Sequence, residues 1–414
     1  MTPRAHVIGA GLAGLSAATA LTEAGWAVTV YEAGPAAGGR CRSYFDRALG
    51  CRIDNGNHLL LSGNHATMAY LDRIGARDTL GGPGAPVFPF CDVRTGARWT
   101  LRPSAGRIPW WIFSPRRRVP GTRARDYLVL RRLARAAPGA TVAGVLGGSG
   151  ALYRDLLEPL AIAALNTPAE TALATLLGRI VEETLMRGGG ACVPLFPRVG
   201  LSESLVDPAL DWLAARGAVV LTGRRIAGLR IEGARVTALE TPDGPLPVGA
   251  GAAIVVAVPP WVATDLLPGL PAPDQFEAIV NVHFRQTRTA EHPDFIGLIG
   301  GTAEWIFAKP EVLSVTISAA NRLAEVPGDE LAARSWADIQ RALGVPGKMP
   351  VMRVVREKRA TFAATAASEA LRPGPHVGLD LFAVAGDWTA TGLPATIEGA
   401  IRSGRTAANM LISR

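Results

Sequence analysis

The sequence contains no apolar run long enough to cross a membrane as a helix. Its longest apolar stretch, residues 248–263, falls short of the roughly 20 residues that a helical span needs, and Pro259 and Pro260 interrupt it. The four cysteines show no CxxC spacing, which argues against zinc and dithiol redox motifs. Unpaired cysteines suit a reducing compartment. We therefore expect a cytoplasmic protein with neither disulfides nor a bound metal.

Lysine is scarce, because only three of the 43 basic residues are lysines, and the net charge is +8. Arginine-rich codon usage accounts for most of this charge. No recognised nucleic-acid-binding module accompanies it, so nucleic acid is not expected as a partner. One cluster places aromatic rings before a basic triplet: Trp110, Trp111, Phe113, Arg116, Arg117 and Arg118. This arrangement suits docking on the anionic inner face of a cell membrane, and a solvated loop beside a core aromatic patch explains it equally well.

A glycine-rich turn lies between a short apolar strand and a helix near the N-terminus. Residues 6–8 read as a buried parallel strand, and the apolar spacing of residues 12–21 predicts a helix. In the GxGxxG pattern between them, Gly9 permits the tight turn, Gly11 lets the backbone approach a pyrophosphate, and Gly14 allows close helix–strand packing. The first helical N–H groups, at Ala13 and its neighbours, attract phosphate.

The strand at residues 27–31 ends in Glu32, which is followed by Ala33. A carboxylate at this position accepts hydrogen bonds from ribose hydroxyls and would repel a 2′-phosphate, so NADP is disfavoured while NAD and FAD both remain compatible. The glycine-rich residues 144–150 and 297–301 lack the strand and the terminal acid of a second dinucleotide unit. Electrons therefore come from the substrate itself or from an external donor that meets the cofactor directly.

Two further motifs favour FAD. A second glycine turn ends in Gly39 and Arg40, whose planar donor fork can bridge the pyrophosphate and the ribityl chain. Near the C-terminus an apolar strand ends in Gly386 and Asp387, and a helix begins a few residues later. Together these motifs resemble those of the flavin amine oxidase and phytoene desaturase superfamily.

The superfamily resemblance implies tight, noncovalent FAD binding. It implies that Asp387 holds a ribityl hydroxyl, that the helix after Thr396 points its N-terminus at the flavin pyrimidine ring, and that a backbone group near Ile226 meets the adenine. The further cofactor contacts that it implies are Ala395, Ile397 and Asn57.

The order of the motifs predicts an α/β fold with two interleaved domains. Residues 1–62, 193–260 and 373–414 are expected to form a discontinuous, Rossmann-type FAD-binding domain of the GR2-like class. Residues 63–192 and 261–372 are expected to form an α+β substrate domain. Within the first domain the pattern predicts one helix over about 202–216, and strands at 218–221, 226–231, 236–240 and 253–258.

A narrower resemblance rests on the loop Asp54-Asn55-Gly56-Asn57-His58 and on residues 157–167, 304–307 and 385–400. These stretches resemble the hydroxysqualene dehydroxylases, also called squalene-associated FAD-dependent desaturases, with Asn57 where glutamine is expected. The resemblance implies a C30 isoprenoid alcohol as substrate: loss of water leaves an allylic cation, and hydride from the flavin gives squalene. It implies an acid for the leaving oxygen and a water-excluding site.

His58 is the candidate for the acid or for a residue that positions water, and a histidine bonded to a loop carbonyl is an equal alternative. Asp54 is expected to cap the loop, and His283 and Asn166 are weaker candidates. A carotenoid-type desaturase and a flavin amine oxidase are the alternative functions, because the motifs fit either direction of hydride transfer. Against an amine oxidase, the strand near residues 279–284 contains no lysine, and Thr396 stands where that family places a cage tyrosine.

Overall fold

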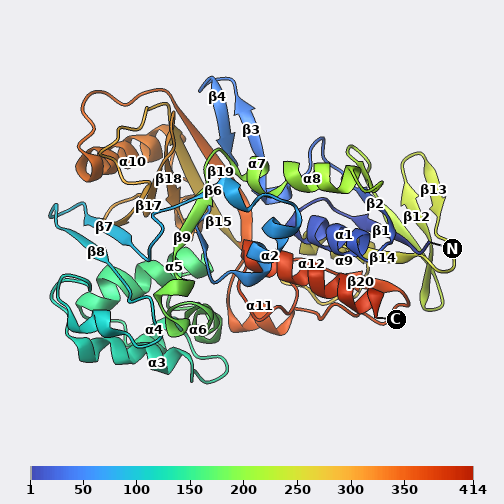
Figure 1. The fold of residues 1–414 in the computed structure, drawn as a ribbon, viewed down its shortest axis with the longest axis horizontal. Coiled ribbons are helices and arrows are strands. Elements are labelled where there is room, and N and C mark those ends of the chain that lie inside the picture. The colour runs from blue at the N-terminus through green and yellow to red at the C-terminus, as the bar shows by residue number, and fades with distance from the viewer. Residues whose placement is uncertain (1, 414) are drawn as a thin grey trace.

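The computed structural model describes residues 2–413, which form an elongated molecule with both termini at one end (Figure 1). That end is built around a parallel five-stranded sheet, in the order β10-β2-β1-β14-β20. Its strands are β1 (Arg4–Ile8), β2 (Ala27–Tyr31), β10 (Val219–Leu221), β14 (Ala253–Val256) and β20 (Phe382–Val384). Three separate parts of the chain supply them, so the predicted α/β, Rossmann-type fold class is confirmed.

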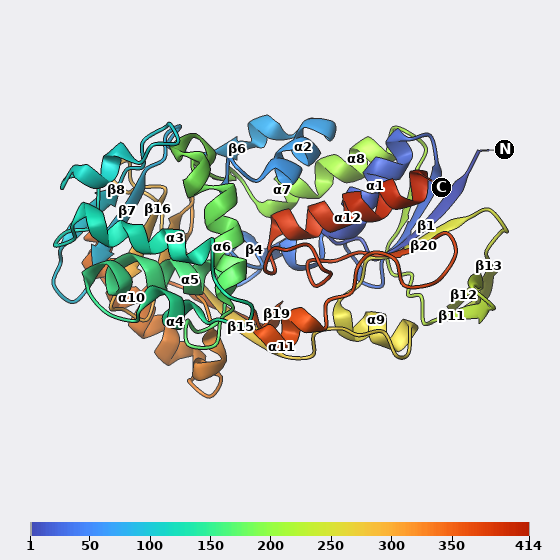
Figure 2. The same ribbon diagram turned by 90° about the horizontal axis from the view of Figure 1, so that it is seen from below.

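Helices cover both faces of this sheet, as Figure 2 shows. On one face α1 (Leu12–Glu23) packs against α12 (Ile397–Ile412) so closely that a Cβ at Gly404 would lie 2.0 Å from the Ala13 carbonyl oxygen. On the other face α9 (Pro260–Leu266) packs against Ile254 and Val256. A hairpin-linked sheet extends from this end: β11 (Gly228–Glu232), β12 (Arg235–Thr241) and β13 (Gly244–Pro247).

The opposite end contains a mixed seven-stranded sheet in the order β19-β15-β18-β17-β16-β7-β8, where only β16 and β7 run parallel. Its strands are β7 (Phe88–Asp92), β8 (Arg98–Leu101), β15 (Phe276–Phe284), β16 (Phe295–Ile299), β17 (Trp305–Ala308), β18 (Leu313–Ile317) and β19 (Met352–Phe362). Helix α10 (Gly328–Leu343) covers one face. The other face meets a second cluster of helices: α3 (Leu130–Leu133), α4 (Val142–Leu146), α5 (Glu158–Leu165) and α6 (Ala174–Glu183).

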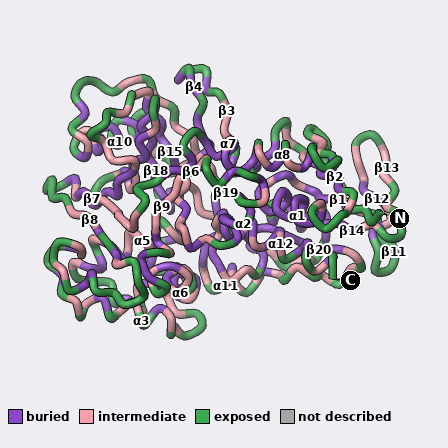
Figure 3. The backbone as a smooth tube through the Cα atoms, viewed as in Figure 1, coloured by how far each residue is buried: buried purple, intermediate pink, exposed green. Residues whose placement is uncertain are grey.

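The long strands β15 and β19 join the two ends of the molecule. Phe276, the first residue of β15, pairs with Phe362, the last residue of β19. Phe362 is buried in the same apolar cluster as Ile254 and Trp388, which lie at the end of the molecule with the five-stranded sheet. The buried stretches of backbone accordingly run through both sheets in Figure 3. Among residues 2–413 no helix is long and apolar enough to cross a membrane.

Two short sheets and the remaining helices lie around the junction. They are β3 (Ser43–Asp46) with β4 (Cys51–Asp54); β5 (Leu60–Leu61) and β6 (Leu80–Gly81) on either side of β9 (Pro194–Pro197); and α2 (His65–Arg73), α7 (Leu201–Leu205), α8 (Asp207–Ala214) and α11 (Ala366–Ala370).

One element differs from the sequence expectation, and another bears on the expected domain boundary. The single helix expected over 202–216 is two helices, α7 and α8, because Pro208 at the start of α8 has no N–H to continue the hydrogen-bond ladder. Helix α2 follows the boundary expected at residue 62, yet its Tyr70 and Leu71 are buried in the core of the five-stranded sheet. The Tyr70 hydroxyl also donates to the Leu205 carbonyl at 2.9 Å. The division into the two domains as bounded above stays a prediction.

Candidate functional site

The N-terminal glycine turn has the geometry that a nucleotide site needs. Gly9 has φ +103°, and a Cβ there would lie 2.5 Å from the Ala257 carbonyl oxygen. A Cβ at Gly14 would lie 1.9 Å from the Gly9 carbonyl oxygen. Gly11 differs, because beyond its chain neighbours no atom of residues 2–413 lies within 4 Å of a Cβ built there. The face of Gly11 is therefore open to a ligand, whereas Gly9 and Gly14 are required by the fold.

Helix α1 begins beside this open face without a side-chain cap. Gly11 is its N-cap, and its first turn carries no acidic residue, so the N–H groups near Ala13 and the positive end of the helix dipole are available to an anion. Glu32 lies next to the turn, where its carboxylate accepts from the Ala10 N–H at 2.9 Å and from the Gly34 N–H at 2.7 Å. Two oxygens have further lone pairs to accept from ribose hydroxyls.

The other predicted contacts converge on the same turn. The Arg224 N–H donates to the Glu32 carbonyl at 2.8 Å, which brings the strand segment with buried Ile226 alongside Glu32 and Ala33. Gly39 has φ +56°, and a Cβ there would lie 3.4 Å from the Gly11 Cα. The two glycine turns thus face each other across the place where a pyrophosphate would lie.

Arg40 joins the two ends of the chain. Its guanidinium donates both to the Ala360 carbonyl and, through one nitrogen, to the two carboxylate oxygens of Asp387 at 2.7 Å. Buried Arg372 holds the same loop by donating to the carbonyls of Asp387 and Thr389. Gly386 is fixed by a bond from its N–H to the Ser403 hydroxyl at 2.9 Å.

Helix α12 begins at Ile397, directly after Ala395 and Thr396. The Thr396 hydroxyl accepts from the Gly399 N–H at 3.0 Å, so one of the first-turn donors is capped internally and the rest stay available. The uncapped donors, the open face of Gly11 and the carboxylate of Glu32 fit an FAD molecule, which Gly11, Glu32, Arg40 and Asp387 would hold.

Asp54, the first residue of the loop that runs to His58, is almost fully buried, with 2% of its surface exposed. Its Oδ1 accepts from the Ser43 hydroxyl at 2.5 Å and from the Leu201 N–H at 2.9 Å, and its Oδ2 forms an ion pair with Lys309. Burial alone would raise the pKa of Asp54, but the Lys309 ammonium and the hydrogen-bond donors outweigh it and hold the pKa below its usual value. The backbone N–H that Asp54 accepts from is that of Leu201, at the start of α7, and its own loop supplies none; the ion pair with Lys309 was not expected from the sequence.

Asn57 anchors the loop to the seven-stranded sheet. Its side-chain nitrogen donates to the Ser314 hydroxyl at 2.7 Å and to the Thr316 hydroxyl at 3.0 Å. Thr316 donates in turn to Asn281 at 2.9 Å, and Ser314 shares a hydrogen bond with His283 at 2.8 Å. Because the Asn57 nitrogen is committed to this network, a cofactor contact from Asn57 would use its buried side-chain oxygen, which has no partner among residues 2–413.

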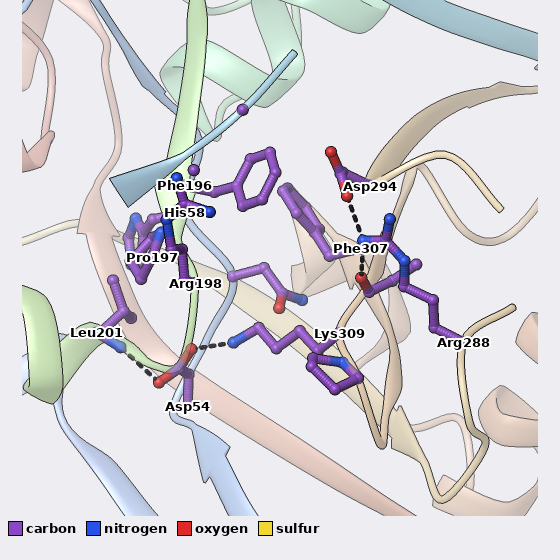
Figure 4. Close-up of a pocket in the computed structure, with 15 residues that line it drawn as sticks. Asp54, His58, Phe196, Pro197, Arg198, Leu201, Arg288, Asp294, Phe307 and Lys309 are labelled. Atoms are coloured by element: carbon purple, nitrogen blue, oxygen red, sulfur yellow. Dashed lines mark hydrogen bonds and ion pairs between the residues drawn. The ribbon is translucent and has the colours of Figure 1, made fainter. Parts of the chain in front are cut away.

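His58 lines a cavity of about 330 Å³ together with Asp54, Asn57 and Lys309 (Figure 4). Burial lowers the pKa of His58 to about 4, so its ring is neutral at pH 7. A neutral imidazole lacks the extra proton that a general acid needs, which leaves for His58 the second expected role of positioning a polar group. Among residues 2–413 the ring has no hydrogen-bond partner, and the side chain lines the cavity.

The weaker candidates have structural partners. Asn166 donates to the Thr361 hydroxyl at 2.9 Å and accepts from the Ala319 N–H at 2.7 Å, which fixes a turn between the two sheets. His283 is buried, and burial lowers its pKa to about 4. Neither side chain lines the cavity beside His58.

Three cations that line this cavity were not expected from the sequence: Lys309, Arg198 and Arg288. Arg288 forms an ion pair with Asp294, which also lines the cavity. Lys309 alone carried a signal in the sequence, because it is one of only three lysines in an arginine-rich chain.

Comparison with known proteins gives the family. The profile of the family described as flavin containing amine oxidoreductase matches residues 12–412. A protein named hydroxysqualene dehydroxylase from Rhodopseudomonas palustris is 48% identical over 414 residues, covering 100% of this chain and 99% of its own. Its namesake from Zymomonas mobilis is 45% identical over 408 residues, covering 99% of each chain.

Solved structures share the fold at low identity. Putrescine oxidase bound to putrescine has a TM-score of 0.72 at 17% identity, with 100% of both chains covered. A putative protoporphyrinogen oxidase from Exiguobacterium has a TM-score of 0.68 at 16% identity, covering 100% of this chain and 99% of its own. The full-length curated relatives are far more similar in sequence. This chain therefore belongs to the flavin-containing amine oxidoreductases and, among them, to the hydroxysqualene dehydroxylase family.

Proposed function

We propose that this protein is an FAD-dependent oxidoreductase that converts hydroxysqualene to squalene. The observation that carries the proposal is the 45–48% identity, over essentially the whole chain, to three proteins named hydroxysqualene dehydroxylase. FAD is the cofactor, and in its reduced form it supplies the hydride that replaces the lost hydroxyl. Because the chain carries one dinucleotide motif only, an external donor reduces the flavin.

The residues beside the cofactor site suit this chemistry better than amine oxidation. The strand on which amine oxidases carry their lysine corresponds to β15, and its buried polar residues are Asn281 and His283. Both are bonded into the Asn57 network. At the start of α12, Thr396 caps the helix where an amine oxidase has a cage tyrosine. β15 therefore carries no lysine, and the start of α12 carries no tyrosine that could form a cage for a substrate ammonium.

The cavity combines apolar and polar walls. Phe196 and Phe307 line it, and both rings pack near Phe295, with centroid distances of 6.3 and 6.4 Å. An allylic cation must be stabilised without contact to a nucleophile. Aromatic faces stabilise cations in this way. The polar wall of Asp54, His58 and Lys309 offers groups that can hold a hydroxyl and the departing water.

The test is an anaerobic single turnover. Enzyme with photoreduced flavin is mixed with hydroxysqualene, flavin reoxidation is followed by absorbance, and squalene is measured by mass spectrometry. We expect reoxidation and squalene in equal amounts, and none with the oxidised enzyme. A flavin that stays reduced would contradict the proposal. Hydrogen peroxide released with amines in air would favour an amine oxidase instead, and oxidation of an isoprenoid hydrocarbon with a quinone would favour a desaturase.

We further propose that a hydrophobic surface turn delivers the protein to membranes, where a C30 substrate dissolves. Within the 3₁₀ turn Trp110–Phe113, Trp110 is 65% exposed and Phe113 is 63% exposed, and nearby Ile108 is 57% exposed. Trp111 was expected to be part of this surface, but it is only 6% exposed. Its ring packs edge-on against Tyr127, with centroids 5.0 Å apart.

The three arginines that follow the turn differ in their exposure. Arg116 is exposed, whereas Arg117 and Arg118 are half-buried and Arg118 donates to the Ile112 carbonyl at 2.6 Å. Exposed Trp110, Phe113 and Arg116 are therefore the proposed contacts. The test compares flotation with phosphatidylglycerol-containing vesicles for wild type, Trp110→Ser/Phe113→Ser and a control, Phe45→Ser, which removes another exposed aromatic ring at 63% exposure. Loss of flotation in the double variant alone is expected, and equal flotation of all three would refute the proposal.

A further inference from the structure

The cavity beside His58 contains one side chain that carries a proton and can release it. Lys309 follows β17 directly and points its ammonium at Asp54 (Figure 4). Its side chain is 23% exposed, whereas that of Asp54 is 2% exposed. The ammonium therefore lies between a buried carboxylate on one side and the cavity on the other.

The other polar groups of the cavity do not fit the role of acid. Arg198 and Arg288 line it, but a guanidinium does not give up its proton in proteins. Asp54 is an ionised acceptor with its oxygens occupied, and Asp294 is paired with Arg288. The ring of His58 is neutral at pH 7, since burial lowers its pKa to about 4.

We propose that Lys309 protonates the departing hydroxyl of the substrate; this rests on the proposed function. The carbon–oxygen bond breaks, the oxygen takes a proton from the Lys309 ammonium, and water leaves. Reduced FAD, when bound, would supply the hydride that converts the remaining allylic cation to the hydrocarbon, and the flavin would give up two electrons in doing so. Lys309, now a neutral amine, regains a proton from solvent through the open side of the cavity.

Asp54 makes this assignment physically reasonable. Its carboxylate is held by the Ser43 hydroxyl and the Leu201 N–H, so it cannot swing away, and it fixes the ammonium at one end of the cavity. Phe196 and Phe307 line the same cavity, which places aromatic faces where an allylic cation would form. His58 completes the polar wall as a neutral group that can accept a hydrogen bond from the substrate hydroxyl.

The remaining charges around Lys309 come from other elements. His283 on β15 lies within electrostatic reach of Lys309 and is neutral at pH 7, since burial lowers its pKa to about 4. Arg40 lies within electrostatic reach of His58 from the cofactor side of the loop. Of the two carboxylates that line the cavity, Asp54 pairs with Lys309 and Asp294 pairs with Arg288.

The decisive variant is Lys309→Arg, which keeps a positive charge opposite Asp54 and cannot donate its proton. Lys309→Met is the second variant, and Lys348→Arg, at an exposed lysine, is the matched control. Each is checked for FAD content, melting temperature and calorimetric binding of hydroxysqualene. We expect Lys309→Arg to keep FAD and bind the alcohol within threefold of wild type.

Single-turnover rates are then compared for two substrates, hydroxysqualene and its acetate ester, whose leaving group departs as an anion and needs no protonation. Loss of a general acid costs about 10²- to 10⁴-fold in rate, so Lys309→Arg should be at least 100-fold slower than wild type on the alcohol and much closer to it on the ester. An alcohol rate within threefold of wild type, or equal losses on both substrates, would overturn the assignment. No squalene from wild type would refute the proposed function itself.

Discussion

Gly11 offers the sharpest test of the cofactor site, because its position separates binding from folding. Its backbone is extended, with φ −73° and ψ 177°, a conformation that alanine adopts without strain. A Cβ there meets no atom of residues 2–413 within 4 Å beyond its chain neighbours. We therefore expect Gly11→Ala to fold normally and to place a methyl group where the pyrophosphate approaches.

The magnitude follows from the contacts that such a methyl group disturbs. Hydrogen bonds from backbone N–H groups to a charged phosphate contribute about 1.5–3 kcal/mol each. Losing one or two of them should weaken FAD binding by about 3 kcal/mol, or roughly 100-fold. The unfolding free energy of the apoprotein should change by less than about 1 kcal/mol, because glycine and alanine differ little at an unstrained position.

Gly14→Ala gives the opposite pattern. Its Cβ would lie 1.9 Å from the Gly9 carbonyl oxygen, so α1 and the turn must separate, and we expect the apoprotein to lose more than about 3 kcal/mol. Gly249→Ala, at an exposed glycine with open space around it, is the control. FAD affinity is measured by flavin fluorescence and apoprotein stability by urea unfolding. Wild-type affinity in Gly11→Ala, or equal destabilisation at positions 11 and 14, would show that the pyrophosphate does not lie there.

Three other expectations concern buried polar groups. The pKa of His283 in the folded protein, about 4, is below its usual value of 6.5, so the unfolded chain binds more protons between these pH values. The free energy of unfolding should therefore fall by up to about 1.4 kcal/mol per pH unit as the pH drops from 6.5 to 4. In His283→Gln, urea unfolding should show a shallower pH dependence, and an unchanged slope would contradict this. Arg372→Met leaves the carbonyls of Asp387 and Thr389 without a donor, and a loss of about 3 kcal/mol or more in thermal unfolding is expected. Glu398→Gln removes one of the oxygens that accept from the first N–H groups of α2 and should cost about 1–3 kcal/mol, whereas an unchanged melting temperature would show that this cap contributes nothing.

The sequence predicts the nucleotide half of the fold because its determinants are local. Buried parallel strands read as continuous apolar runs, and the strand expected at residues 27–31 is β2, Ala27–Tyr31. The glycine spacing is local as well, since Gly9 and Gly14 contact each other directly. The strand expected near residues 279–284 is the C-terminal part of β15, Phe276–Phe284, whose first residues belong to the junction between the two ends of the molecule.

Which side chains of a surface turn are buried depends on distant parts of the chain, and the expectation that Trp111 lies at the surface was wrong. Trp110 and Trp111 are neighbours of the same type, yet one is 65% exposed and the other 6%. The difference is set by Tyr127, which receives the Trp111 ring and comes from a part of the chain whose position the local pattern does not encode. Helix α2 likewise packs on the core of the five-stranded sheet through partners far away in the sequence, such as Leu205, whose carbonyl accepts from the Tyr70 hydroxyl.

The ion pair of Asp54 with Lys309 shows the general limit most clearly. The two residues are 255 positions apart, on β4 and just beyond β17, and the two strands belong to different sheets. What brings them together is the Asn57 network with Ser314 and Thr316, which fixes the loop of residues 54–58 against β18, the neighbour of β17. Each of these polar residues is ordinary in isolation, so their meaning depends on the pairing of strands. A lysine in an arginine-rich chain was nevertheless a usable signal, because a reaction that needs a proton donor can use an ammonium and cannot use a guanidinium.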